Sequence, residues 1–121
     1  MVVYRMTEAE KQLADLVWAN EPLGSGQLVQ LALEHMNWKK STTYTVLKKL
    51  CTNDLFRNEN SIVSSKISLD EYTRLLGEVY LDQNYEGSLP NFVAAFIRKK
   101  KISRADVEEL ERMIAEYKET E

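Results

Sequence analysis

Hydroxyl and ammonium side chains recur at helical spacing in the first half of the chain. Thr42, Thr45 and Lys49 are three and four residues apart, which places them on one face of a helix. Tyr44 and Lys48 share a neighbouring line of the same helix. Serine and threonine hydroxyls donate to and accept from base edges, and lysine contacts phosphate or guanine. The spacing therefore predicts a helix that lies in the major groove of duplex DNA.

The composition of this stretch supports that prediction. Exposed helix positions are ordinarily filled by strong helix formers such as glutamate, glutamine and alanine, whereas serine and threonine lower helix propensity. Here Ser41, Thr42, Thr43 and Thr45 fall close together. The competing interpretation is an ordinary surface helix with solvated lysines, because short motifs also occur by chance.

Positive charge gathers in the same part of the chain. The net charge of the 121 residues is −3, but residues 1–67 hold eight Lys/Arg and seven Asp/Glu, and residues 68–121 hold eight and twelve. Within residues 37–67 there are six basic and two acidic side chains, which predicts a phosphate-facing patch. The predicted DNA-contacting residues are Lys39, Lys40, Ser41, Thr42, Tyr44, Thr45, Lys48, Lys49, Arg57, Asn58, Asn60 and Ser61.

Two helices are predicted to precede this one. Thr7 and Glu10 form a capping box that starts the first helix, and Asn20-Glu21-Pro22 ends it. The second is predicted to begin at Gly24 or Ser25.

The third helix and a hairpin follow. A turn at residues 36–38 leads into a helix over about residues 41–53, with Ser41 as its cap and an inward stripe of Val46, Leu47 and Leu50. Residues 55–58 and 62–67 have strand character and predict a β-hairpin, with Val63 and Ile67 on one face. Three helices followed by a hairpin predict a winged helix-turn-helix over residues 1–68.

The remaining residues, 69–121, predict three amphipathic helices. Apolar side chains recur at helical spacing in residues 72–80, 89–97 and 107–117. A single such stripe is usually plain core, but so short a segment buries little surface alone, and pairing with a second copy would complete it. The residues predicted to form the dimer interface are Tyr72, Leu75, Leu76, Val79, Leu89, Phe92, Val93, Phe96, Leu110 and Ile114.

Other classes of function find little support. The single cysteine, Cys51, and the single histidine, His35, provide no zinc pattern, and we expect no metal or cofactor. No paired carboxylates, activated nucleophile or glycine-rich phosphate loop indicates an enzyme. No window resembles a signal core or a membrane span, so we expect a cytoplasmic protein that is not inserted in a membrane.

Short motifs along nearly the whole chain resemble the penicillinase-repressor family, which includes the beta-lactamase and methicillin-resistance repressors. They are Thr7-Glu8-Ala9-Glu10, Leu16-Val17-Trp18, Trp38, the stretch from Thr42 to Leu50, Gly87-Ser88-Leu89 and residues 103–110. The resemblance implies a mostly α-helical, homodimeric winged-helix repressor that binds a palindromic operator, with Thr42 and Thr45 on its recognition helix. Where many members have Ser-Pro-Lys this chain has Lys39-Lys40-Ser41, and Tyr44 replaces a usually basic or amide residue.

The resemblance also implies a way to release the operator. Resistance repressors are inactivated when a peptide bond before a phenylalanine is cleaved, and the corresponding bond here is Ala95-Phe96. The resemblance implies a membrane sensor protease as the partner that triggers this cleavage. Copper-responsive relatives carry a cysteine-rich tail, whereas this chain ends in Glu119-Thr120-Glu121, so copper or zinc sensing is not expected. The alternative to a DNA-binding repressor is a winged-helix protein-interaction module whose acidic C-terminal helices bind a partner.

Overall fold

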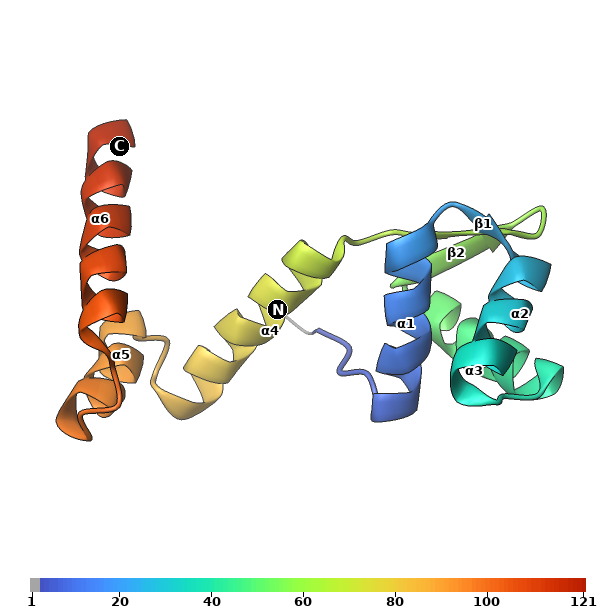
Figure 1. The fold of residues 1–121 in the computed structure, drawn as a ribbon, viewed down its shortest axis with the longest axis horizontal. Coiled ribbons are helices and arrows are strands. Elements are labelled where there is room, and N and C mark those ends of the chain that lie inside the picture. The colour runs from blue at the N-terminus through green and yellow to red at the C-terminus, as the bar shows by residue number, and fades with distance from the viewer. Residues whose placement is uncertain (1–2) are drawn as a thin grey trace. The chain divides into compact units, whose positions relative to one another are not determined.

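The computed structural model describes residues 3–121, which divide into two compact units. The first ends at Gly77 and the second comprises Glu78–Glu121. The elements are α1 (Glu8–Asn20), β1 (Leu23–Gly24), α2 (Ser25–Met36), α3 (Lys40–Thr52), β2 (Phe56–Glu59), β3 (Ile62–Ser65), α4 (Leu69–Asn84), α5 (Leu89–Arg98) and α6 (Arg104–Thr120) (Figure 1). The predicted class, mostly α with a small β wing, is confirmed.

The first helix begins at the predicted capping box. The Glu10 backbone N–H donates to Thr7 Oγ1 at 3.2 Å, and the Thr7 N–H donates to Glu10 Oε1 at 2.7 Å. Each side chain thus satisfies an amide that has no partner inside the helix. The backbone turns extended at Glu21, directly before Pro22, and α1 ends there.

Strands β2 and β3 form the predicted hairpin, and β1 adds a third strand. The sheet is antiparallel with the order β1-β3-β2, and Glu59 pairs with Ile62 across a two-residue turn. Asn60 and Ser61 in that turn have φ of 53° and 62°, the left-handed geometry that matches the twist of a tight hairpin. β3 ends at Ser65, two residues before the predicted end, and β1 was not predicted.

The core of the first unit lies between its three N-terminal helices, the hairpin and the start of α4. Val63 of β3 and Phe56 of β2 are buried, and Ile67, which was predicted to share a face with Val63, packs against the same core. Trp18 packs against both Phe56 and Tyr72, with ring centroids 5.3 Å and 5.9 Å apart. The buried apolar residues are Leu13, Ala14, Val17, Leu23, Leu28, Ala32, Leu47, Leu50, Leu55, Phe56, Val63 and Tyr72.

In the second unit, a serine caps the N-terminus of α5 and another caps that of α6. Ser88 Oγ accepts from the Asn91 N–H at 3.1 Å, and Ser103 Oγ accepts from the Asp106 N–H at 3.0 Å. Tyr80, Tyr85, Phe92 and Phe96 form a chain of ring contacts, with centroids between 5.1 and 6.2 Å apart. Edge-to-face contacts of this kind hold the end of α4 against α5 within this unit.

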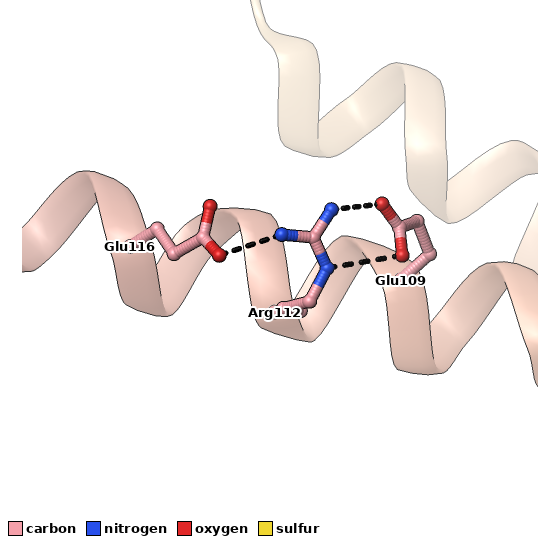
Figure 2. A network of polar contacts seen from close by, with 3 residues as sticks. All are labelled: Glu109, Arg112 and Glu116. Carbon is pink, nitrogen blue, oxygen red and sulfur yellow. Dashed lines mark hydrogen bonds and ion pairs between the residues drawn. The ribbon is translucent and has the colours of Figure 1, made fainter.

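One side of α6 carries an ion-pair network. The Arg112 guanidinium donates to Glu109 on one side and to Glu116 on the other, the latter at 2.6 Å (Figure 2). Arg112 is two residues from both Leu110 and Ile114, about 200° around the helix. The charged and apolar faces of α6 are therefore separate.

Among residues 3–121, no helix is long and apolar enough to cross a bilayer.

Candidate nucleic-acid interface

A tight turn joins α2 to α3. Asn37 adopts the left-handed conformation (φ 56°, ψ 37°) and ends α2, and its N–H donates to Leu33 O at 3.0 Å. The Trp38 N–H donates to Ala32 O at 3.3 Å. Only residues 37–39 separate the two helices, which is the geometry of a helix-turn-helix.

The start of α3 differs from the prediction. The helix begins at Lys40 with Lys39 as its N-cap residue, so Ser41 lies inside the first turn and does not cap it. The Thr43 N–H donates to Lys39 O at 3.1 Å, which closes the first turn two residues earlier than a cap at Ser41 would.

The inner side of α3 consists of Thr43, Leu47 and Leu50, all buried. Their spacing of four and three residues places them on one line of the helix. Val46, which was predicted to face inward, is only half-buried at the edge of this line, and Thr43 takes the core position instead. The Thr43 hydroxyl is directed at Lys39 O, 3.5 Å away, so a buried polar group has an acceptor.

The outer side of α3 brings together five of the predicted DNA-contacting residues. At 100° per residue they occupy about 120° of the helix surface, and all five are exposed. Thr45 Oγ1 donates its proton to Ser41 O at 2.9 Å, which leaves its lone pairs and its methyl group to a ligand. The residues of this outer face are Ser41, Thr42, Thr45, Lys48 and Lys49.

Positive charge surrounds this face. Lys39 and Lys40 are exposed at the N-terminal end of α3, where the helix dipole also favours an anion. Within residues 3–121, no ion pair involves Lys39, Lys40 or Lys48. Lys66, by contrast, pairs with Asp54 at 3.1 Å, so it adds little to the patch. This end of the unit can thus neutralise phosphates.

Lys49 also stabilises the charged form of Glu10, a buried carboxylate in the first unit. Glu10 at the start of α1 is 3% exposed, and burial alone would raise the pKa of its carboxyl. Hydrogen bonds from the Tyr4 hydroxyl and from Thr7, together with the charge of Lys49, outweigh burial and lower that pKa. The same contact raises the pKa of Tyr4 to about 12.

The wing places its predicted residues on different sides. Arg57 and Asn58 are both exposed, but they are neighbours on one strand and therefore point to opposite faces of the hairpin. Asn60 and Ser61 form the tip. Ser61 O accepts from the Ser25 N–H at 2.8 Å, which ties the tip to the first residue of α2.

Tyr44 is the one predicted contact residue that is not fully exposed. It is half-buried, and its hydroxyl donates to Ser25 Oγ at 3.2 Å. Sequence reasoning treated Ser25 only as a possible cap. The cap residue is Gly24, whose N–H donates to Gln27 Oε1 at 2.7 Å, and no short-range pattern announces the contact between Ser25 and α3.

Comparison with known proteins agrees with this geometry. A sequence model of the family described as penicillinase repressor matches residues 6–116, which include both compact units almost entirely. The chain belongs to the penicillinase repressor family. It is also 18% identical over 118 residues to a penicillinase repressor of Bacillus licheniformis, with 94% of this chain and 92% of that protein covered. The resemblance seen in the short motifs is confirmed, and the family is one of transcriptional repressors rather than of enzymes.

The family's match continues into α5 and α6, which expose much apolar surface in this structure. Leu89 is 58% exposed and Tyr117 66% exposed. Within the second unit, a groove between the two helices is lined by Leu89, Pro90, Val93, Leu110, Met113, Ile114 and Tyr117. Leu89, Val93, Leu110 and Ile114 of this groove were predicted dimer contacts.

Two other residues of the predicted dimer set lie elsewhere. Tyr72 is 1% exposed and sits in the core of the first unit, where its hydroxyl donates to Tyr4 O at 2.8 Å and accepts from the Met6 N–H at 3.1 Å. Leu76, one turn later, packs against the same core. The spacing of these two residues also fits an interface stripe, but in this structure both pack in or against the core of the first unit.

Residues Ala95 and Phe96, at the predicted cleavage bond, lie inside α5. Ala95 is half-buried and Phe96 is exposed. A protease that cleaves there must first unwind the second half of this helix, because its backbone groups are bonded within the helix.

Proposed function

We propose that this repressor binds a palindromic operator as a homodimer, with one α3 in each of two successive major grooves. DNA binding is assigned to residues 1–68 and dimerisation to residues 69–121, without Tyr72 and Leu76. A two-fold dimer would present two recognition helices about 34 Å apart, the spacing of one DNA turn. Its place of action is the cytoplasm, where operator DNA is found.

The observation that carries the proposal is the outer face of α3. Its exposed hydroxyls and ammonium groups supply the chemistry that reads base edges and phosphates. Its opposite side is fully buried, so the orientation of the face is fixed by the core. Lys48 on this face and the flanking Lys39 and Lys40 have no ion-pair partner within residues 3–121.

Dimerisation is supported by the apolar groove of the second unit. Isolated apolar residues on a surface are ordinary, but a contiguous apolar groove is typical of an interface. Met113 and Ile114 are 52% and 56% exposed in the single chain, and the same groove on a second copy offers a matching surface.

Operator binding is tested with threonine variants. A duplex selected by the wild-type protein from random DNA is titrated by fluorescence anisotropy, against a scrambled duplex. Thr42→Ala and Thr45→Ala should each weaken binding to the selected duplex by roughly five- to a hundredfold. Equal affinity of the wild-type protein for both duplexes would contradict the proposal.

Thr73→Ala is a matched control for this test. Thr73 is exposed and donates to the carbonyl oxygen four residues earlier, Leu69 O, at 2.8 Å, as Thr45 donates to Ser41 O. It lies on α4 and is neither a predicted DNA contact nor one of the residues predicted to form the dimer interface, so Thr73→Ala should leave operator affinity unchanged. If the α3 variants bind DNA as the wild type does but lose a protein partner, the interaction-module alternative is correct.

Release of the operator is proposed to follow an upstream signal. Cleavage of Ala95-Phe96 by a membrane sensor protease would separate residues 1–95 from α6 and so remove Leu110 and Ile114 from the dimer. Incubation with such a protease followed by mass spectrometry tests this route. Two fragments divided at this bond, with loss of operator binding, are expected, and an intact chain would exclude it.

A further inference from the structure

Tyr44 connects the recognition helix to two other elements. Its hydroxyl donates to Ser25 Oγ at 3.2 Å, and Ser25 is only 6% exposed at the first position of α2. The backbone N–H of Ser25 donates to Ser61 O in the wing at 2.8 Å. A chain of two hydrogen bonds thus joins α3, the start of α2 and the tip of the wing.

The ring of Tyr44 has a further neighbour. Lys40 Nζ lies 6.0 Å from the ring centroid, and the two residues are one helical turn apart on α3. An ammonium group over the face of an aromatic ring is attracted by the ring's quadrupole. Lys40 is exposed at the N-terminal end of the helix, where its long side chain would otherwise sample many directions. The contact with the Tyr44 ring limits those directions.

We propose that Tyr44 is a positioning residue of the DNA interface and does not read a base. It braces α3 against α2 and the wing through Ser25, and it directs Lys40 toward a phosphate. This inference rests on the proposed operator binding. It differs from a role in base readout because the Tyr44 hydroxyl donates its proton to a nearly buried partner, and because Tyr44 is half-buried whereas the five residues of the outer face are exposed.

A double-mutant cycle tests the bracing contact. Tyr44→Phe and Ser25→Ala each remove one partner of the same hydrogen bond, and we expect each to weaken operator binding by roughly two- to tenfold. The double variant should be no weaker than the weaker single variant, because both changes break one interaction. Binding to a panel of duplexes with single base-pair changes should keep the wild-type order of preference.

The opposite results would overturn the inference. If Tyr44→Phe flattens the preference at one base pair while Ser25→Ala does not, the hydroxyl reads that base. If the two effects add, the hydroxyls act separately. Thermal unfolding of every variant identifies loss of fold. If Ser25→Ala does not fold, Ser25→Gly takes its place in the cycle.

The interaction of Lys40 with the ring is tested by salt dependence, which a general loss of stability would not change. The slope of log affinity against log salt falls in magnitude by about 0.9 for each phosphate that the protein no longer neutralises. Lys40→Ala and Tyr44→Leu should both lower the slope by about this amount, whereas Tyr44→Phe keeps the ring and should keep the wild-type slope. A wild-type slope for Tyr44→Leu would contradict the proposal.

A different result would contradict the proposed function itself. If the wild-type protein does not prefer its selected duplex over a scrambled one, operator binding is wrong, and the role of Tyr44 inferred from it is wrong as well.

Discussion

At the scale of single residues, buried polar side chains hold the segment that precedes α1 in place. Glu10 accepts hydrogen bonds from the Tyr4 hydroxyl at 2.6 Å and from the Thr7 N–H at 2.7 Å. The Tyr72 hydroxyl bonds to the backbone of the same N-terminal segment. The segment that precedes α1 is therefore held from both sides.

Replacement of Glu10 by glutamine should lower the free energy of unfolding at pH 7 by about 1–3 kcal/mol, because charge-assisted hydrogen bonds are removed. The pKa of Glu10 is lowered in the folded state, so its stabilising effect is present above the ordinary glutamate pKa of about 4.3 and disappears as pH falls through the lowered value. The difference between wild type and Glu10→Gln should shrink accordingly in urea unfolding from pH 7 to pH 3. A difference that does not change with pH would contradict this account.

Removal of the Tyr72 hydroxyl should destabilise the first unit by about 1 kcal/mol, since Tyr72→Phe deprives the Tyr4 carbonyl and the Met6 N–H of their partner. Chemical unfolding followed by tryptophan fluorescence measures the change. Tyr80→Phe serves as control, because Tyr80 is 49% exposed and should tolerate the same change. Equal effects of the two substitutions would show that the hydroxyl of Tyr72 adds nothing.

At the scale of elements, the wing combines regular pairing with a strained turn. Asn60 and Ser61 both have positive φ, and only asparagine of the two tolerates this region readily. The turn nevertheless forms because β3 is paired on both sides, with β2 and with β1.

Ser61→Gly should therefore raise the free energy of unfolding by about 0.5–1 kcal/mol, since glycine adopts a positive φ without a Cβ clash. The matched change Ser64→Gly, in the regular part of β3, should lower it, because glycine weakens a strand interior. Both are measured by urea unfolding. Destabilisation by Ser61→Gly would mean that the serine side chain stabilises the turn.

Most elements were predictable because their signals are local. The capping box of α1, the caps Ser88 and Ser103 and the outer face of α3 all depend on residues within one or two helical turns. The sequence did not predict β1, because two residues show no alternation and pair with β3 only through the fold. The inward positions of Thr43 and Tyr72 were also missed, since a polar residue gives no hydrophobic signal and an interface stripe has the same spacing as a core stripe.

At the scale of the whole molecule, the proposed repressor depends on two copies acting together. Ile114→Asp places a charge in the apolar groove of the second unit and should shift the protein to monomers in sedimentation equilibrium. Operator affinity should fall by at least tenfold, because a monomer binds only one half-site.

Ala115→Asp introduces the same charge at the next residue of α6, which is exposed and does not line that groove. It should leave both the dimer and operator binding intact. Dissociation by both substitutions would mean that added charge, and not the groove, accounts for the effect.

The division of α3 into a buried line and an exposed line has a consequence for how target preference changes. No residue of the outer face belongs to the interior, so its side chains can be exchanged without loss of packing. A library randomised at Ser41, Thr42 and Thr45 should therefore consist largely of folded proteins, and selection from it should yield repressors with new and mutually exclusive target sequences.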